Sequence, residues 1–113
     1  MPENIQMICL VRLIGVERQT RMKGAGSRTH MMVSLGAALM TLVSSYGFLP
    51  IVGAAGVSVD ASRVAASIAA GIGFLGAGLI IRDGTKVSGL STAATIWTTA
   101  AIGILCTLDN IYY

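Results

Sequence analysis

Four apolar segments separated by short polar ones make up most of this chain. They cover residues 5–16, 29–52, 64–81 and 90–108. A helix needs about 20 residues to cross a hydrocarbon core of about 30 Å, so the last three segments are long enough to span a membrane. The pattern therefore predicts an all-α fold, a polytopic transmembrane helical bundle with three spans and a short first helix.

The first apolar segment is the exception. Its 12 residues would rise only about 18 Å as a helix, and Arg12 lies inside it. Two interpretations stay open. The segment is either a partial helix whose arginine reaches the membrane surface along its aliphatic stem, or the remaining part of a longer span.

The composition favours a membrane protein. Hydrophobic residues make up 54% of the 113 and charged residues only 12%, which is too few to cover a water-facing surface. Apart from Arg12, the basic residues behind the net charge of +3 lie in short segments between the apolar ones. No nucleic acid partner is therefore expected, and the partner in contact with most of the surface is the lipid bilayer. A single domain is expected over residues 1–113.

The basic residues predict an orientation. Half of them lie in residues 17–28, between the first and second apolar segments. Because positively charged loops stay on the cytoplasmic side, this basic loop is expected in the cytoplasm. The segment 53–63 and both termini are then outside, and the segment 82–86 is inside.

Residues between the segments predict helix boundaries. Asp60 is a suitable N-cap for the third helix, and Asp83 with Gly84 is a suitable stop after it. Ser88 or Ser91 is expected to cap the fourth helix.

The third helix is predicted to have two unlike faces. At 100° per residue, large aliphatic side chains such as Ile68 and Ile72 lie on one side, and the other side carries only small residues. Because small residues let helix backbones approach closely in a membrane, this small face is expected to point into the bundle and to carry the helix packing. Its residues are Ala66, Ala69, Ala70, Gly73, Gly76 and Ala77.

The fourth helix carries hydroxyl groups on one face. Thr92, Thr95 and Thr99 share this face, while Trp97 points nearly the opposite way. The hydroxyls can bond back to their own helix, bridge to a neighbouring helix or line a polar groove.

No constellation for catalysis is recognisable, and an enzyme is not expected. Residues 71–76 match the pattern GxGxxG, but a dinucleotide site needs a preceding strand and an acidic residue about 20 positions on. His30 is the only histidine. It is expected at the membrane interface, with metal binding as the alternative. Cys9 and Cys106 lie far apart in apolar sequence and are expected to be buried free thiols.

Charged residues at the helix ends have two interpretations. They act as topology determinants and helix caps, or they form functional clusters at the two ends of the bundle. On the second interpretation, Glu17, Arg18 and Arg28 form a cytoplasmic cluster, and Asp60 and Arg63 form another outside.

Five motifs in order are more specific than any of these residues alone. Together they resemble the MgtC/SapB family over nearly the whole chain, and more closely its N-terminal transmembrane domain, as in a truncated member. The pattern departs mildly at Ser27 and Ala61, and it is lost after Gly103. Longer members of the family continue into a fifth helix and a C-terminal cytoplasmic domain, neither of which is expected here. The motifs are residues 15–19 (GVERQ), 28–30 (RTH), 60–63 (DASR), 71–78 (GIGFLGAG) and 87–94 (VSGLSTAA), followed by Trp97.

The resemblance implies a function and a location. It implies a multi-pass protein of the bacterial inner membrane that is linked to magnesium homeostasis, to growth in low magnesium and, in pathogens, to virulence. It implies action through helix contacts with other inner-membrane proteins, including membrane ATPases. It also implies that the chain forms a homo-oligomer. No cofactor is expected, and magnesium enters as a physiological signal or ligand without an identified site. The functional candidates carried over by position are Glu17, Arg18, Arg28, Thr29, His30, Asp60, Arg63, Thr92 and Trp97.

Two alternatives remain beside this function. One is a transporter or channel subunit for magnesium or another ion, although carriers usually place ionisable groups near the midplane. The other is an inactive, truncated relative.

Overall fold

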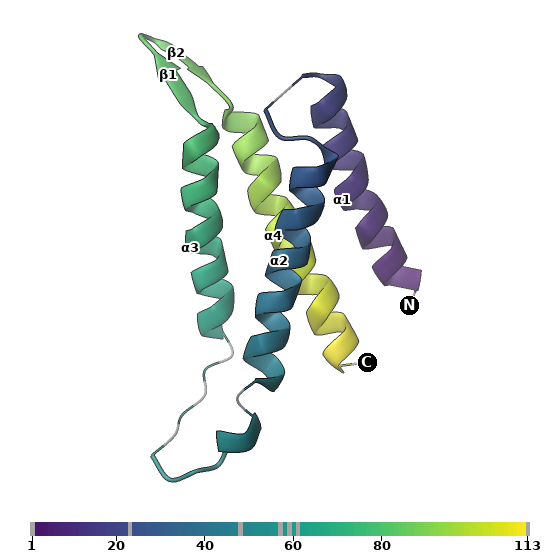
Figure 1. Cartoon of the computed structure of the whole chain (residues 1–113), viewed down its shortest axis with the longest axis vertical. Helices are drawn as coiled ribbons and strands as arrows, with labels where there is room; N and C mark the ends of the chain where they lie inside the picture. The colour runs from purple at the N-terminus through teal and green to yellow at the C-terminus, as the bar shows by residue number, and fades with distance from the viewer. Residues whose placement is uncertain are drawn as a thin grey trace.

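The computed structural model describes residues 2–22, 24–47, 49–56, 58, 60 and 62–112. Helices make up most of this part of the chain, so the predicted all-α bundle is confirmed (Figure 1). In chain order, the elements are α1 (Pro2–Thr20), α2 (Ser27–Tyr46), the short 3-10 helix η1 (Leu49–Ile51), α3 (Ser62–Leu79), β1 (Ile81–Asp83), β2 (Lys86–Ser88) and α4 (Leu90–Tyr112).

Three helical segments are long and apolar enough to cross a membrane. They are Ser27–Ile51, Ser62–Leu79 and Leu90–Asp109, which correspond to the three spans predicted from hydropathy. The first helix is not short, however. Its 19 residues give it a length of about 28 Å, because the helix extends past the apolar segment into polar sequence at both ends.

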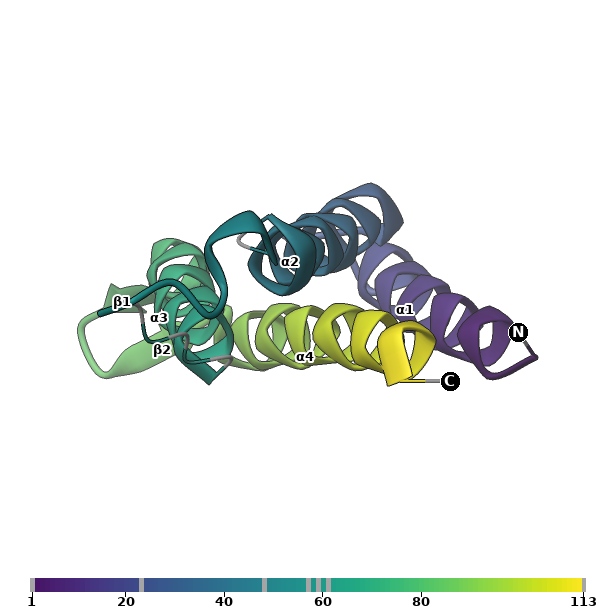
Figure 2. The same ribbon diagram turned by 90° about the horizontal axis from the view of Figure 1, so that it is seen from below.

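The helices form a thin assembly with α4 at its centre. The overall dimensions are 55 × 35 × 15 Å, and α2, α3 and α1 all lie against α4 (Figure 2). His30 of α2 contacts Thr95 near the start of α4, and Ala38 contacts Thr107 further along. Helices α2 and α4 therefore run in the same direction.

The predicted inward face of α3 is wrong. Ile68 is buried in a cluster with Ala37 and Ala100, whereas the small face, except at Gly76 and Ala69, is exposed. The reason lies in the partner helices, because α2 and α4 supply the small residues and α3 supplies the large ones. The residues of the small face that the structure leaves exposed are Ala66, Ala70, Gly73 and Ala77.

A β-hairpin lies between α3 and α4. Strands β1 and β2 pair antiparallel, with Asp83 opposite Lys86, so Asp83 and Gly84 begin a hairpin turn and do not end the helix as predicted. Gly84 has φ of +61° in this turn. An Asp-Gly pair is a strong hairpin signal, but the strands are too short to show an alternating pattern.

Neither predicted serine caps α4. The carbonyl oxygen of Gly89 accepts the backbone N–H of Ala93 at 2.9 Å, which places Gly89 at the N-cap. With φ of +85°, this position also suits glycine. The Ser88 hydroxyl instead lies 3.5 Å from the carbonyl oxygen of Ile81.

Candidate functional site

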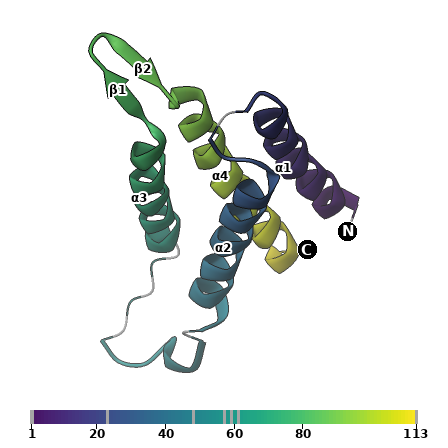
Figure 3. The same ribbon diagram turned by 45° about the horizontal axis from the view of Figure 1, so that its top comes forward.

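The end of the molecule with the hairpin collects most of the charge, and we call it the basic end. It contains the end of α1, the starts of α2 and α4, and the hairpin (Figure 3). Its described basic residues are Arg18, Arg21, Arg28, Arg82 and Lys86, and its acidic residues are Glu17 and Asp83. The predicted loop 17–28 is much shorter, because α1 continues to Thr20 and α2 begins at Ser27.

A polar junction joins α1 to α4 at this end. The guanidinium group of Arg18 donates to both carboxylate oxygens of Glu17, from Nε at 2.5 Å and from a terminal nitrogen at 2.7 Å. Its other terminal nitrogen donates to the hydroxyl of Ser91 at 2.8 Å. Arg21 reaches the same carboxylate with Nε at 2.7 Å. We call Glu17, Arg18, Arg21 and Ser91 the polar junction.

The polar junction holds its arginine in a fixed, charged state. The Arg18 side chain is 12% exposed and that of Glu17 is 42% exposed. The hydrogen bond to Glu17 raises the pKa of Arg18 above its ordinary value, and the nearby negative charge adds to this effect. A forked pair of this kind sets orientation as well as charge. It fixes the guanidinium so that it points at the first turn of α4.

His30 forms a second bridge, between α2 and α4. The side chain is fully buried in the first turn of α2. Nδ1 lies 2.8 Å from the carbonyl oxygen of Gly26, and Nε2 lies 3.0 Å from the hydroxyl of Thr95. Because a carbonyl only accepts, Nδ1 donates to Gly26, and the ring reaches α4 through the contact of Nε2 with Thr95. With both nitrogens engaged, His30 is not arranged to bind a metal.

The threonines of α4 share one face, as their spacing predicts, and this face points into the bundle. Thr92 and Thr99 are buried, whereas Trp97 on the other side is 54% exposed. Thr95 bonds back to the carbonyl oxygen of Thr92 at 2.8 Å and also meets His30. Within the described chain, the buried hydroxyls of Thr92 and Thr99 have no hydrogen-bond partner. The hydroxyl face therefore bridges helices at one position, Thr95.

The two predicted charged clusters are only partly assembled. Glu17 and Arg18 come together, but Arg28 and its neighbour Thr29 are exposed at the start of α2. At the opposite end of the bundle, Asp60 and Arg63 are joined by a backbone hydrogen bond of 3.3 Å. No ion pair joins their side chains in the described part of the chain.

Asp60 acts at the start of α3, as predicted. Its carboxylate accepts the Ser62 backbone N–H at 2.9 Å and the Ser62 hydroxyl at 2.7 Å, which is the capping interaction. These two hydrogen bonds lower the pKa of Asp60 from its ordinary value of 3.8.

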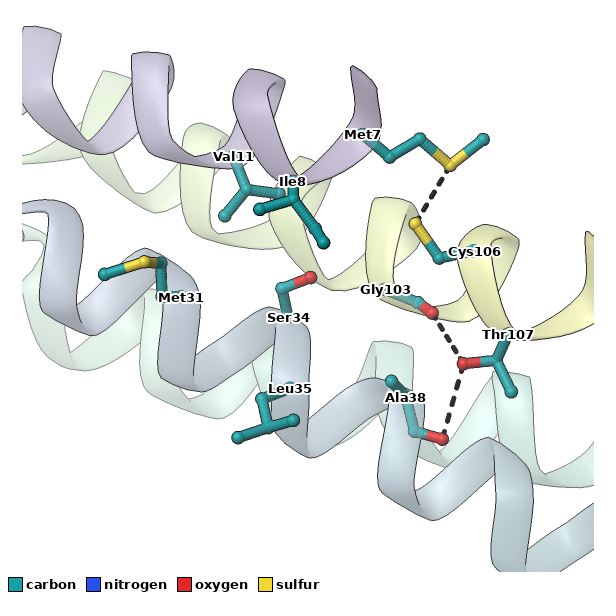
Figure 4. Close-up of a pocket in the computed structure, with 10 residues that line it drawn as sticks. All are labelled: Met7, Ile8, Val11, Met31, Ser34, Leu35, Ala38, Gly103, Cys106 and Thr107. Carbon is teal, nitrogen blue, oxygen red and sulfur yellow. Dashed lines mark hydrogen bonds between the residues drawn. The ribbon is translucent and has the colours of Figure 1, made fainter. Parts of the chain in front are cut away.

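An apolar groove of about 410 Å³ runs between α1, α2 and α4 (Figure 4). Two of its polar side chains, Thr107 and Cys106, are engaged within the chain. The Thr107 hydroxyl donates to the carbonyl oxygen of Gly103 at 3.0 Å, and the thiol of Cys106 lies 2.9 Å from the sulfur of Met7. The groove therefore offers apolar contact to a lipid chain or a helix more than recognition of a polar ligand. It is lined by Met7, Ile8, Val11, Met31, Ser34, Leu35, Ala38, Gly103, Cys106 and Thr107.

The cysteines and acidic residues provide no metal centre in the described part of the chain. No group of three or more metal-binding side chains was found there. Cys9 and Cys106 are free, as predicted, but Cys9 is exposed on α1 and Cys106 is only half-buried. The prediction that both thiols are buried is wrong because apolar sequence in such a helix can face the membrane instead of the bundle.

Several partners in the site were missed by sequence reasoning. Ser91 was considered only as a cap, and Gln19 was read only as part of a motif. The amide oxygen of Gln19 accepts the Ser27 hydroxyl at 3.2 Å and thereby ties α1 to α2. A single polar residue beside a motif does not indicate which distant residue it will contact. These pairs could therefore not be predicted without the fold.

Comparison with known proteins identifies relatives over nearly the whole chain. The family model described as the MgtC family matches residues 7–113, which includes the part after Gly103 where the motif pattern is lost. No solved structure matches the chain.

The curated relatives are about half identical to this chain. YhiD of Escherichia coli strain K12, named provisionally as a magnesium transporter, is 50% identical over 92 residues, which are 81% of this chain and 43% of YhiD. Protein MgtC of Brucella abortus strain 2308 is 51% identical over 96 residues, 83% of this chain and 36% of that protein. Protein MgtC of Salmonella typhimurium strain LT2 is 48% identical over 99 residues, 87% of this chain and 38% of that protein. The chain thus spans about two fifths of these relatives.

Proposed function

Because this chain belongs to the MgtC family, we propose that it is an inner-membrane protein of magnesium homeostasis that acts by binding other membrane proteins through helix contacts. The observation that carries this proposal is the exposed small face of α3. Ala66, Ala70, Gly73 and Ala77 lie on one side of a membrane-spanning helix and contribute little to the packing of this chain.

The small face suits a contact between helices. Close approach of two backbones in a membrane gains van der Waals contact that bulky side chains prevent. A Cβ built at Gly73 meets no atom within 4 Å, whereas one at Gly76 lies 3.5 Å from the Cβ of Ala93. Gly76 therefore packs within the chain, and Gly73 is open to a partner helix.

The distribution of ionisable residues supports contact between helices more than the transport of ions. Apart from Arg28, Arg63 and Asp109 at their ends, the three candidate spans contain no carboxylate, lysine or arginine. Their other ionisable side chains are Tyr46, Cys106 and His30. The two ring nitrogens of His30 are bound to Gly26 and Thr95. Intramembrane pathways for ions usually use several such groups. By the positive-inside rule, we place the basic end in the cytoplasm.

The test compares two glycines of α3. Gly73→Leu fills the small face, and Gly78→Leu makes the same change on another side of the helix, where a Cβ also meets no atom within 4 Å. In membranes of the native bacterium grown in low magnesium, Gly73→Leu should lose co-purified membrane proteins while Gly78→Leu keeps them. Equal co-purification with both variants would contradict the proposal.

Magnesium transport is the second candidate, because the relative YhiD bears that provisional name. We place it second on the charge argument above. Purified protein in liposomes should pass no magnesium above the level of empty liposomes. A magnesium flux that Asp60→Asn abolishes would reverse the order of the two candidates.

A further inference from the structure

We propose that the β-hairpin between α3 and α4 is a membrane-surface anchor that binds the phosphate headgroups of anionic phospholipids. The hairpin and Leu90, the first residue of α4, expose apolar and basic side chains together. Ile81 is 63% exposed, Val87 51% and Leu90 63%, while Arg82 and Lys86 are exposed between them. Water suits the basic groups but not the apolar ones, whereas the lipid headgroup boundary accommodates both.

The length of the hairpin favours lipid over a partner in the cytosol. Each strand has three residues and rises about 10 Å. The headgroup region is about 5–8 Å deep on each side of the hydrocarbon core. Since the spans α3 and α4 end immediately beside the hairpin, most of the hairpin lies at headgroup depth.

The register of the two strands determines on which face of the hairpin each charged side chain lies. Arg82 is paired with Val87, and Asp83 is opposite Lys86. Successive residues of a strand point to opposite faces, so Arg82 lies on the face away from Asp83. An acidic neighbour therefore offsets Lys86 more than Arg82.

The guanidinium group of Arg82 is held for phosphate binding. Its Nε donates to the carbonyl oxygen of Gly84 at 3.2 Å, which folds the side chain over the turn. The two terminal nitrogens of a guanidinium carry four further N–H groups, and arginine uses such a fork for bidentate contact with phosphate. The exposed basic residues Arg21 and Arg28 at this end add to the attraction of anionic lipid.

The first test measures the lipid that remains bound to the protein in mild detergent. Protein extracted from membranes with phosphatidylglycerol and phosphatidylethanolamine is analysed by mass spectrometry for the ratio of the two lipids. Arg82→Gln and Lys86→Gln should each lower this ratio by up to about fivefold, as expected for one basic residue near an anionic surface. Arg63→Gln, at the opposite end, is the matched control and should leave it unchanged.

The second test places a fluorophore on the hairpin. Val87→Trp in a Trp97→Phe background gives a single tryptophan, whose emission should shift to the blue when phosphatidylcholine nanodiscs are supplemented with phosphatidylglycerol. The shift should disappear with Arg82→Gln and Lys86→Gln combined. An unchanged lipid ratio, or an emission shift that persists without the two charges, would overturn the proposal. Loss of co-purified protein with an unchanged lipid ratio would also overturn it and identify a protein-docking surface.

Discussion

Arg18 at the end of α1 donates a hydrogen bond of 2.8 Å to Ser91 in the first turn of α4, 73 residues further along the chain. The same guanidinium group also donates two hydrogen bonds to the carboxylate of the neighbouring Glu17. From the sequence, Arg18 is predicted to be a charged residue of the loop after the first helix. In the structure, it joins the first helix to the last. The charged residues at this end have a structural role in addition to setting orientation.

The polar junction should contribute modestly to stability. Glu17→Gln removes the charge that holds Arg18 and Arg21 and should lower the free energy of unfolding in detergent by about 1 kcal/mol, because the group is partly exposed. Ser91→Ala removes only one hydrogen bond and should cost less. A thermal or denaturant titration of the purified protein measures both, and a larger loss in Ser91→Ala than in Glu17→Gln would refute this ranking.

The His30 bridge should matter more than its single threonine partner. Thr95→Val removes one interhelical hydrogen bond, for which membrane proteins give about 0.6 kcal/mol on average. His30→Ala removes both hydrogen bonds and leaves a space at a fully buried position, so its cost should reach about 2–4 kcal/mol. Denaturant unfolding in the same detergent compares the two variants, and equal losses would show that the ring is not the central element of the bridge.

Close approach of α2 and α4 requires glycine at position 103. A Cβ there would overlap the backbone carbonyl of Ser34, whereas a Cβ at Gly36 meets no atom within 4 Å. Gly103→Ala should therefore destabilise the bundle by about 1–3 kcal/mol. Gly36→Ala, the matched control, should be neutral or stabilise it by up to about 1 kcal/mol. The melting temperatures of both variants, measured in the same detergent, test this prediction. Similar values for the two variants would contradict the observed helix contact.

The Asp60 cap should make stability depend on pH in the acid range. Its pKa in the folded protein lies below the ordinary value of 3.8, because Ser62 donates to the ionised carboxylate. The contribution is therefore complete above the unfolded pKa and is lost as the pH falls through the lower folded pKa. The difference in unfolding free energy between wild type and Asp60→Asn should shrink as the pH falls through this range. Ser62→Ala should reduce this pH dependence, and a difference that grows on acidification would have the wrong sign.

Hydropathy was sufficient to predict the spans, because a hydrocarbon core of fixed thickness demands long apolar helices. The boundaries moved by a few residues where polar sequence continued the helix, as at Ser27 and Thr20. The hairpin was missed because three-residue strands carry too little pattern to outweigh a loop interpretation, even though the Asp83-Gly84 pair signals a turn.

The inward face of α3 could not be predicted from α3 alone. Either a small or a large face can pack inward, and the choice depends on the surface offered by the neighbouring helix. Here Ala37 and Ala100 receive Ile68, so the small face remains outside. The burial of His30 has a similar cause, since its partners Gly26 and Thr95 are 4 and 65 positions away, and only the parallel packing of α2 on α4 brings Thr95 to the ring.

The most direct test of the proposed helix contact is photocrosslinking from the exposed small face of α3 in native membranes. A photoreactive amino acid at Ala70 should give a defined adduct with another membrane protein, or with a second copy of this chain, when cells grow in low magnesium. The same group at Gly78, also exposed but outside the small face, should give lipid adducts only. Lipid adducts alone from Ala70, or the same protein adduct from both positions, would contradict the account.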